Sequence, residues 1–140
     1  MAGMIEHLSL SRTIERGYVN LRCAWEPGCT HPLQPNNATW TIDQHEAMVW
    51  SGAWQELFPD RPVPMEVAQP AGAQVAVSRA RVRGRPVGDN QHFRHWLVHT
   101  PLDSSVFGRV WEYLWHIVFG GDVKLCLPVG ECLCSTYDVC

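Results

Sequence analysis

Residues 106–119 read VFGRVWEYLWHIVF, and this stretch constrains the fold more than any other part of the chain. Apolar residues fall on nearly every face of a helix built from it, which predicts a helix from about residue 105 to 119 that is buried on most sides. Asp103 or Ser104 can cap its start, and Gly120-Gly121 ends it. The few polar residues within it therefore need an explanation.

Three of these polar residues, Arg109, Glu112 and His116, are spaced so that a continuous helix projects them from one stripe. A carboxylate and an imidazole held together in an apolar wall can act as a general base or as metal ligands. Alternatively, Arg109 and Glu112 form an ion pair, and His116 donates a hydrogen bond to a backbone carbonyl. The first interpretation predicts an active site and the second a structural network.

Shorter patterns predict the other elements. Apolar residues recur at helical spacing before Gly17 and again before Pro59. Helices are predicted at 4–16, 43–57 and 89–99, strands at 18–23 and 72–78, and cysteine-anchored loops at 24–41 and 122–140. With 140 residues the chain has room for one core, so we expect a single domain over 1–140. The expected fold class is α+β or α/β, with a helix-rich layer on a small sheet stapled by disulfides.

Composition excludes some classes of function. The net charge of −3 does not supply the basic surface on which nucleic-acid binding depends. No apolar stretch is long enough to cross a bilayer, and residues 1–22 lack the pattern of a signal peptide. Four arginines alternate through residues 79–85 and would face an anion together if extended, but a solvated turn is the simpler interpretation. Seven tryptophans predict a core dominated by aromatic packing.

Cysteines lie in two groups near opposite ends of the chain: Cys23, Cys29, Cys126, Cys132, Cys134 and Cys140. Their even number predicts up to three disulfides in an oxidising compartment, with the connectivity left open. A bridge between the groups would close a loop of roughly 100 residues and stabilise the fold by about 4 to 5 kcal/mol. The alternative, structural zinc, usually uses paired C-x2-C or C-x4-C knuckles, whereas this chain has C-x5-C, C-x-C and C-x5-C spacings. Asn37-Ala38-Thr39 is a glycosylation sequon, which also favours a lumenal or extracellular chain.

Several common catalytic patterns are not found. The sequence has no G-x-S-x-G elbow, no P-loop and no G-x-G-x-x-G fingerprint, and cysteines committed to disulfides are not nucleophiles. His92, His95 and His99 have helical spacing and could imitate metal ligands. Because no H-E-x-x-H pattern or carboxylate accompanies them, we expect an exposed polar face instead. No metal site is predicted, and no motif identifies a cofactor.

The segment from Gly108 to Gly120 contains Gly-Arg-x-x-Glu-Tyr-x-Trp-His, and it resembles a family known as domain of unknown function 3431. Residues 72–79, the pair Arg85-Pro86, and the stretch 18–23 with the cysteines resemble the same family, so the resemblance covers most of the chain. Members typically carry a further N-terminal half. The resemblance therefore implies that this chain is the C-terminal portion of the family's domain, for which a partner protein would supply the missing half.

The order of strand, Ser-Arg turn, helix and carboxylate-bearing helix is similar to the acceptor side of mixed α/β glycosyltransferases that use nucleotide sugars. By this resemblance Glu112 is the base that activates an acceptor hydroxyl, and Arg109 and His116 orient it. The N-terminal sheet and the Asp-x-Asp motif that hold nucleotide and metal in such enzymes are not found, so the lone chain is expected to be catalytically incomplete. We expect a glycosyltransferase-like domain, or its non-catalytic remnant, in the secretory pathway. The alternative is a disulfide-stabilised structural or protein-interaction module whose exposed tryptophans contact a partner.

Overall fold

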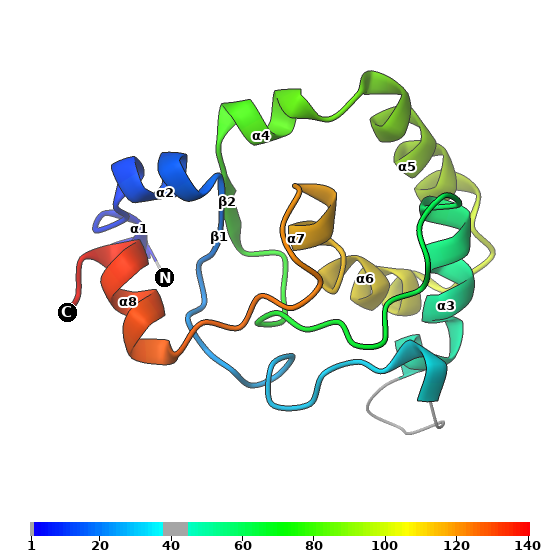
Figure 1. The fold of residues 1–140 in the computed structure, drawn as a ribbon, viewed down its shortest axis with the longest axis horizontal. Helices are drawn as coiled ribbons and strands as arrows, with labels where there is room; N and C mark the ends of the chain where they lie inside the picture. The colour runs from blue at the N-terminus through cyan, green and yellow to red at the C-terminus, as the bar shows by residue number, and fades with distance from the viewer. Residues whose placement is uncertain (1, 38–44) are drawn as a thin grey trace.

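The computed structural model describes residues 2–37 and 45–140 (Figure 1). Its elements are α1 (Ala2–Ile5), α2 (Leu10–Arg16), β1 (Tyr18–Asn20), the 3₁₀ helix η1 (Pro35–Asn37), α3 (His45–Leu57), β2 (Val75–Val77), α4 (Arg79–Gly84), α5 (Val87–His99), α6 (Ser104–Glu112), α7 (Trp115–Val118) and α8 (Val129–Tyr137). In Figure 1 the strands lie between the helices at the two chain ends, α1, α2 and α8, and the remaining helices. The two strands form one antiparallel pair, so the prediction of a helix-rich fold with a small sheet is confirmed.

The larger core is built from aromatic rings, as the tryptophan content predicts. Trp50 and Trp54 on α3 stack with 5.1 Å between ring centroids. Ring contacts continue from Trp54 through Phe58 and Phe93 to Trp111 on α6. All five side chains are buried. Because these rings come from three different helices, their packing holds α3, α5 and α6 together and so positions the segment that carries the predicted site.

All six cysteines are paired, and the disulfide prediction is confirmed. Cys23–Cys132 and Cys29–Cys126 join the two ends of the chain across sequence separations of 109 and 97 residues. Cys134–Cys140 closes a short loop. Cys23 and Cys132 also belong to a second, smaller apolar cluster that includes Tyr137 of α8. The last helix is thus held against the start of the chain by both a covalent bond and packing.

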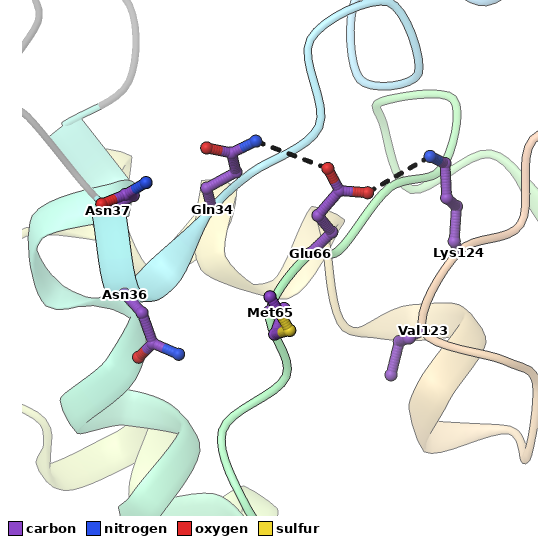
Figure 2. A pocket seen from close by; sticks show the side chains of 7 residues that line it. All are labelled: Gln34, Asn36, Asn37, Met65, Glu66, Val123 and Lys124. Carbon is purple, nitrogen blue, oxygen red and sulfur yellow. Dashed lines mark hydrogen bonds and ion pairs between the residues drawn. The ribbon is translucent and has the colours of Figure 1, made fainter.

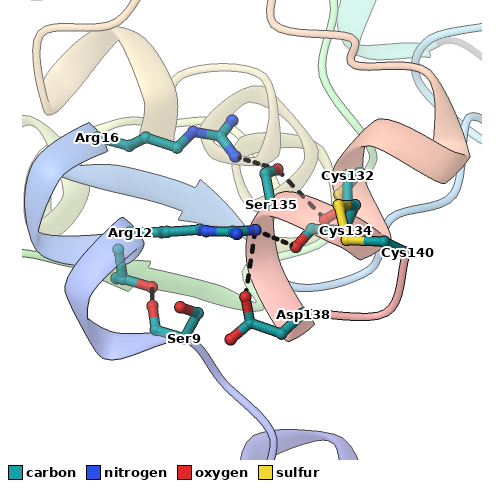
Figure 3. A network of polar contacts seen from close by, with 9 residues as sticks. Ser9, Arg12, Arg16, Cys132, Cys134, Ser135, Asp138 and Cys140 are labelled. Carbon is teal, nitrogen blue, oxygen red and sulfur yellow. Dashed lines mark hydrogen bonds and ion pairs between the residues drawn. A yellow bond between two sulfur atoms is a disulfide. The ribbon is translucent and has the colours of Figure 1, made fainter.

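The helix predicted at 4–16 is two helices, because Ser9 leaves the helical conformation. Its backbone is extended, and its N–H donates to the Thr136 carbonyl of α8 at 2.8 Å. Arg12 and Arg16 of α2 each donate a further hydrogen bond to α8 (Figure 3). α2 therefore contacts the rest of the protein through polar groups, which its apolar spacing does not predict.

Two segments expected to be loops or turns contain α-helices, and the predicted loop 24–41 contains the short 3₁₀ helix η1. The arginine segment after β2 forms α4, whose start is capped by the Ser78 hydroxyl accepting from the Arg81 N–H. A helix separates alternate residues, so these arginines do not face one anion. Instead, Arg81 and Arg85 donate to carbonyls at the end of α7. The tail predicted as a loop over 122–140 contains α8, which is nine residues long.

The helix predicted at 105–119 is interrupted after Glu112. The N–H of Tyr113 bonds to the Val110 carbonyl and that of Leu114 to the Trp111 carbonyl, and these bonds tighten the turn before α7 begins. Since α6 and α7 are separate helices, the predicted continuous stripe of polar residues is wrong.

Candidate functional site

Glu112, at the end of α6, accepts two hydrogen bonds from the segment 69–72. Its carboxylate Oε2 accepts a hydrogen bond from the Gly72 N–H at 3.2 Å, and its backbone carbonyl accepts one from the Gln69 side-chain amide. Gln69 has no exposed surface, and its Oε1 accepts a hydrogen bond from the Tyr18 hydroxyl at 2.8 Å. Burial raises the pKa of that hydroxyl well above its usual range, against the lowering effect of the bond to Gln69. Glu112 thus fastens α6 to the chain that leads into β2.

The ion pair that the structure describes for Arg109 is with Glu46 of α3 rather than with Glu112. A guanidinium nitrogen lies 3.8 Å from Glu46 Oε2, and the Arg109 side chain is 51% exposed whereas that of Glu46 is 4% exposed. Within the described part of the chain, this Glu46 oxygen has no hydrogen-bond partner. No sequence pattern marks Glu46, because an acidic residue in the first turn of a helix is ordinarily solvated.

Tyr113 lies beside both carboxylates. Burial, followed by the negative charges of Glu46 and Glu112, raises the pKa of its hydroxyl to about 12, while the positive charge of Arg109 lowers it. The phenol is therefore neutral at physiological pH. These four residues form what we call the Glu46 cluster, which joins α3 to α6.

His116 lies on α7 and has no exposed surface. Its Nε2 is 3.1 Å from the Val123 carbonyl, and since a carbonyl can only accept, Nε2 must carry the proton. Nδ1 has no hydrogen-bond partner among the residues described. Burial lowers the pKa of the imidazole to about 4, outweighing the raising effects of the Val123 carbonyl and of the charge of Asp122. The ring is neutral at physiological pH and ties α7 to the chain that follows it.

Four clefts are described on the surface, and none of them is lined by Arg109, Glu112 or His116. The largest, of about 600 Å³, lies beside η1 (Figure 2). Asn37, the predicted glycosylation acceptor, is exposed in its lining, whereas the rest of the sequon lies outside the described residues. The largest of these four clefts is therefore separate from the predicted catalytic residues.

The histidines of α5 are exposed. His92 Nε2 lies 2.7 Å from the Glu56 carbonyl, and His99 Nδ1 lies 2.8 Å from the carbonyl of His95, so each is engaged by the backbone. Over residues 2–37 and 45–140, no group of three or more His, Cys, Asp or Glu side chains could hold a metal ion.

A model of the family described as Protein of unknown function (DUF3431) matches residues 1–135. No curated protein and no solved structure matches the chain. The matched range contains the segments from Tyr18 to Gly120 that carry the sequence resemblance and all of the cysteines except Cys140.

Proposed function

We infer that this chain, which belongs to the DUF3431 family of proteins of unknown function, is a disulfide-stabilised interaction module of an oxidising compartment. In this proposal Arg109, Glu112 and His116 hold the fold together, and a partner protein binds elsewhere on the surface. Three disulfides support such a compartment, because cytosolic thiols are kept reduced. Within the described residues, no helix combines the length and the apolar character needed to cross a membrane.

The observation that carries this inference is the internal use of the predicted catalytic side chains. A general base must come within hydrogen-bond reach of a substrate proton. His116 has no exposed surface, and the carboxylate of Glu112 accepts from the Gly72 N–H. The Glu112 carboxylate connects α6 to the segment that leads into β2, and His116 connects α7 to the chain that follows it.

The partner-binding surface that we assign is the outer face of α2. Leu10 and Ile14 are one helical turn apart and are 67% and 68% exposed. An amphipathic helix normally buries its apolar stripe. In α2, by contrast, Arg12 and Arg16 point toward α8 (Figure 3), and the two aliphatic side chains are left in water. This inverted arrangement favours a contact with a second protein. Of the described tryptophans, most of which are buried or half-buried, Trp25 is the exposed one at 44%.

The surface can be tested with the double variant Leu10→Asp/Ile14→Asp. The matched control is Val87→Asp/Val98→Asp, since both valines are exposed aliphatic residues on α5. We expect chemical cross-linking in secreting cells to trap a covalent complex of a partner with the wild type and with the α5 variant but not with the α2 variant. The three proteins should have equal melting temperatures, so that loss of the complex does not reflect unfolding. A complex that persists in the α2 variant would contradict the proposal, and so would a wild type that cross-links to nothing.

The second candidate is a glycosyltransferase-like domain or its non-catalytic remnant. It is favoured by the half-buried state of Glu112 and by a second carboxylate, Glu46, whose charge also acts on Tyr113. The test is release of nucleoside diphosphate from a panel of nucleotide sugars by the wild type, Glu112→Gln and the exposed control Glu131→Gln. The interaction module predicts no turnover by any of the three. Turnover that Glu112→Gln alone abolishes, without a change in melting temperature, would instead establish the enzyme.

A further inference from the structure

The cleft of about 600 Å³ beside η1 is within the size range of sites for small organic ligands. Figure 2 shows Asn36 and Asn37 of η1 on one side and Glu66 and Lys124 on the other, with Met65 between them. The cleft therefore lies between parts of the chain that are far apart in sequence.

Its lining combines two kinds of chemistry. Glu66 Oε2 pairs with the Lys124 ammonium at 3.3 Å, and Glu66 Oε1 lies 3.4 Å from the amide nitrogen of Gln34. Carboxylate, ammonium and amide groups can donate to and accept from hydroxyl groups. Met65, which is 83% exposed, and Val123 supply apolar surface in the same cleft. A pyranose ring matches this combination, because it presents hydroxyl groups at its edge and C–H groups on its faces.

One residue of the lining can also carry a sugar covalently. Asn37 begins the sequon Asn37-Ala38-Thr39, and it is exposed. Within the described residues its side-chain amide makes no hydrogen bond that would have to be broken. A sugar attached to this nitrogen is held at high effective concentration next to Met65 and Glu66, so even weak contacts would keep it in place.

We propose that Asn37 is N-glycosylated and that the first N-acetylglucosamine residues of its glycan occupy this cleft. The donor is a lipid diphosphate-linked oligosaccharide of the secretory pathway: the amide Nδ2 bonds to C1 of the sugar, the C1–O bond to the diphosphate breaks, the lipid diphosphate leaves, and the amide nitrogen gives up one proton. The acetyl methyl groups and the C–H faces pack on Met65 and Val123, and the hydroxyl groups bond to Glu66 and Lys124. The proposal rests on the oxidising compartment of the proposed function but not on the partner-binding face of α2, and the two are tested by different variants.

The experiment uses the full chain secreted from a eukaryotic host, compared with Thr39→Ala, which removes the sequon, and Thr39→Ser, which keeps it. Mass spectrometry before and after glycan removal reports whether Asn37 is modified. Hydrogen peroxide then probes the cleft, because an exposed methionine is oxidised to its sulfoxide. We expect Met65 to be oxidised several-fold more slowly in the wild type and Thr39→Ser than in Thr39→Ala. Met48, which is 53% exposed on α3, should react equally in all three.

Three results would overturn the proposal. Asn37 could be unmodified in secreted protein whose disulfides have formed. The glycan could be present while Met65 reacts as fast as in Thr39→Ala, which would place the sugar in solvent. Finally, added N,N′-diacetylchitobiose could protect Met65 when the attached glycan does not, and the cleft would then bind a free saccharide.

Discussion

Lowering the pH from 7 to 4 should destabilise the fold through His116. The pKa of this imidazole is lowered from the ordinary 6.5 to about 4 in the folded protein, chiefly by burial. Above pH 6.5 the ring is neutral in both states and its contribution is fully present. Below that pH the unfolded chain binds a proton that the folded chain does not, so the free energy of unfolding falls by about 1.4 kcal/mol per pH unit. The accumulated loss is about 3 kcal/mol by pH 4.

The assay compares urea unfolding of the wild type and His116→Gln at pH 7, 6, 5 and 4, followed by tryptophan fluorescence with the disulfides intact. Glutamine removes the titrating group and keeps an N–H donor for the Val123 carbonyl. The stability advantage of the wild type should shrink by about 3 kcal/mol between pH 7 and pH 4, while the exposed control His31→Gln follows the wild type. Carboxylates that titrate in this range affect all three proteins alike. A difference between wild type and His116→Gln that stays constant with pH would refute the reasoning.

Replacing the Cys23–Cys132 bridge with alanines should lower the free energy of unfolding by only about 3 kcal/mol, because Cys29–Cys126 still closes the long loop and the missing bridge closes one of about 13 residues. Removing both bridges should lower the free energy of unfolding by about 7 to 8 kcal/mol. Urea unfolding that shows the same loss for the single and the double replacement would contradict this. Gly28→Ala should lower the free energy of unfolding by more than about 2 kcal/mol, since its φ is +114° and an added Cβ would collide with the backbone oxygen of Gln69. Gly88→Ala, on open helix surface, should melt at or above the wild-type temperature. Arg109→Met should lower the free energy of unfolding by about 1 to 2 kcal/mol, because it leaves the buried Glu46 carboxylate without this cation; the figure is reduced because the arginine is half-exposed. In a double-mutant cycle measured by urea unfolding, Arg109→Met should cost less in a Glu46→Gln background than in the wild type, and an equal cost in both backgrounds would contradict this.

Features that depend on neighbouring residues could be predicted from the sequence. Gly17 ends α2, and Gly120 lies just beyond the end of α7. Both have a φ of +79°, a conformation that glycine adopts without strain. Pro59 follows α3 closely, as a residue that cannot continue a helix should. The cysteine count predicted paired thiols, although the pairing itself needs the tertiary structure. In each case the signal is a property of one residue type.

Features that depend on distant residues could not be predicted. Ser9 interrupts the first helix because its N–H meets Thr136 near the other end of the chain. The break after Glu112 has no glycine or proline to mark it. It separates Glu112 from His116, so the spacing that predicted one polar stripe describes a helix that does not form. Glu46 was missed for the same reason, because its burial follows from the packing of α3 against α6 rather than from its place in α3.

The nested arrangement of the two long bridges has a consequence for proteolysis. A single cut at any peptide bond between Cys29 and Cys126 yields two fragments, and each contains one partner of both bridges. The fragments therefore stay covalently joined, and the nicked protein should migrate as one species until it is reduced. The cut creates two new chain ends but releases neither fragment. If the aromatic core opens, the two fragments can therefore pack together again within one molecule. Connections between the core helices can thus be opened by a protease while the molecule remains in one piece.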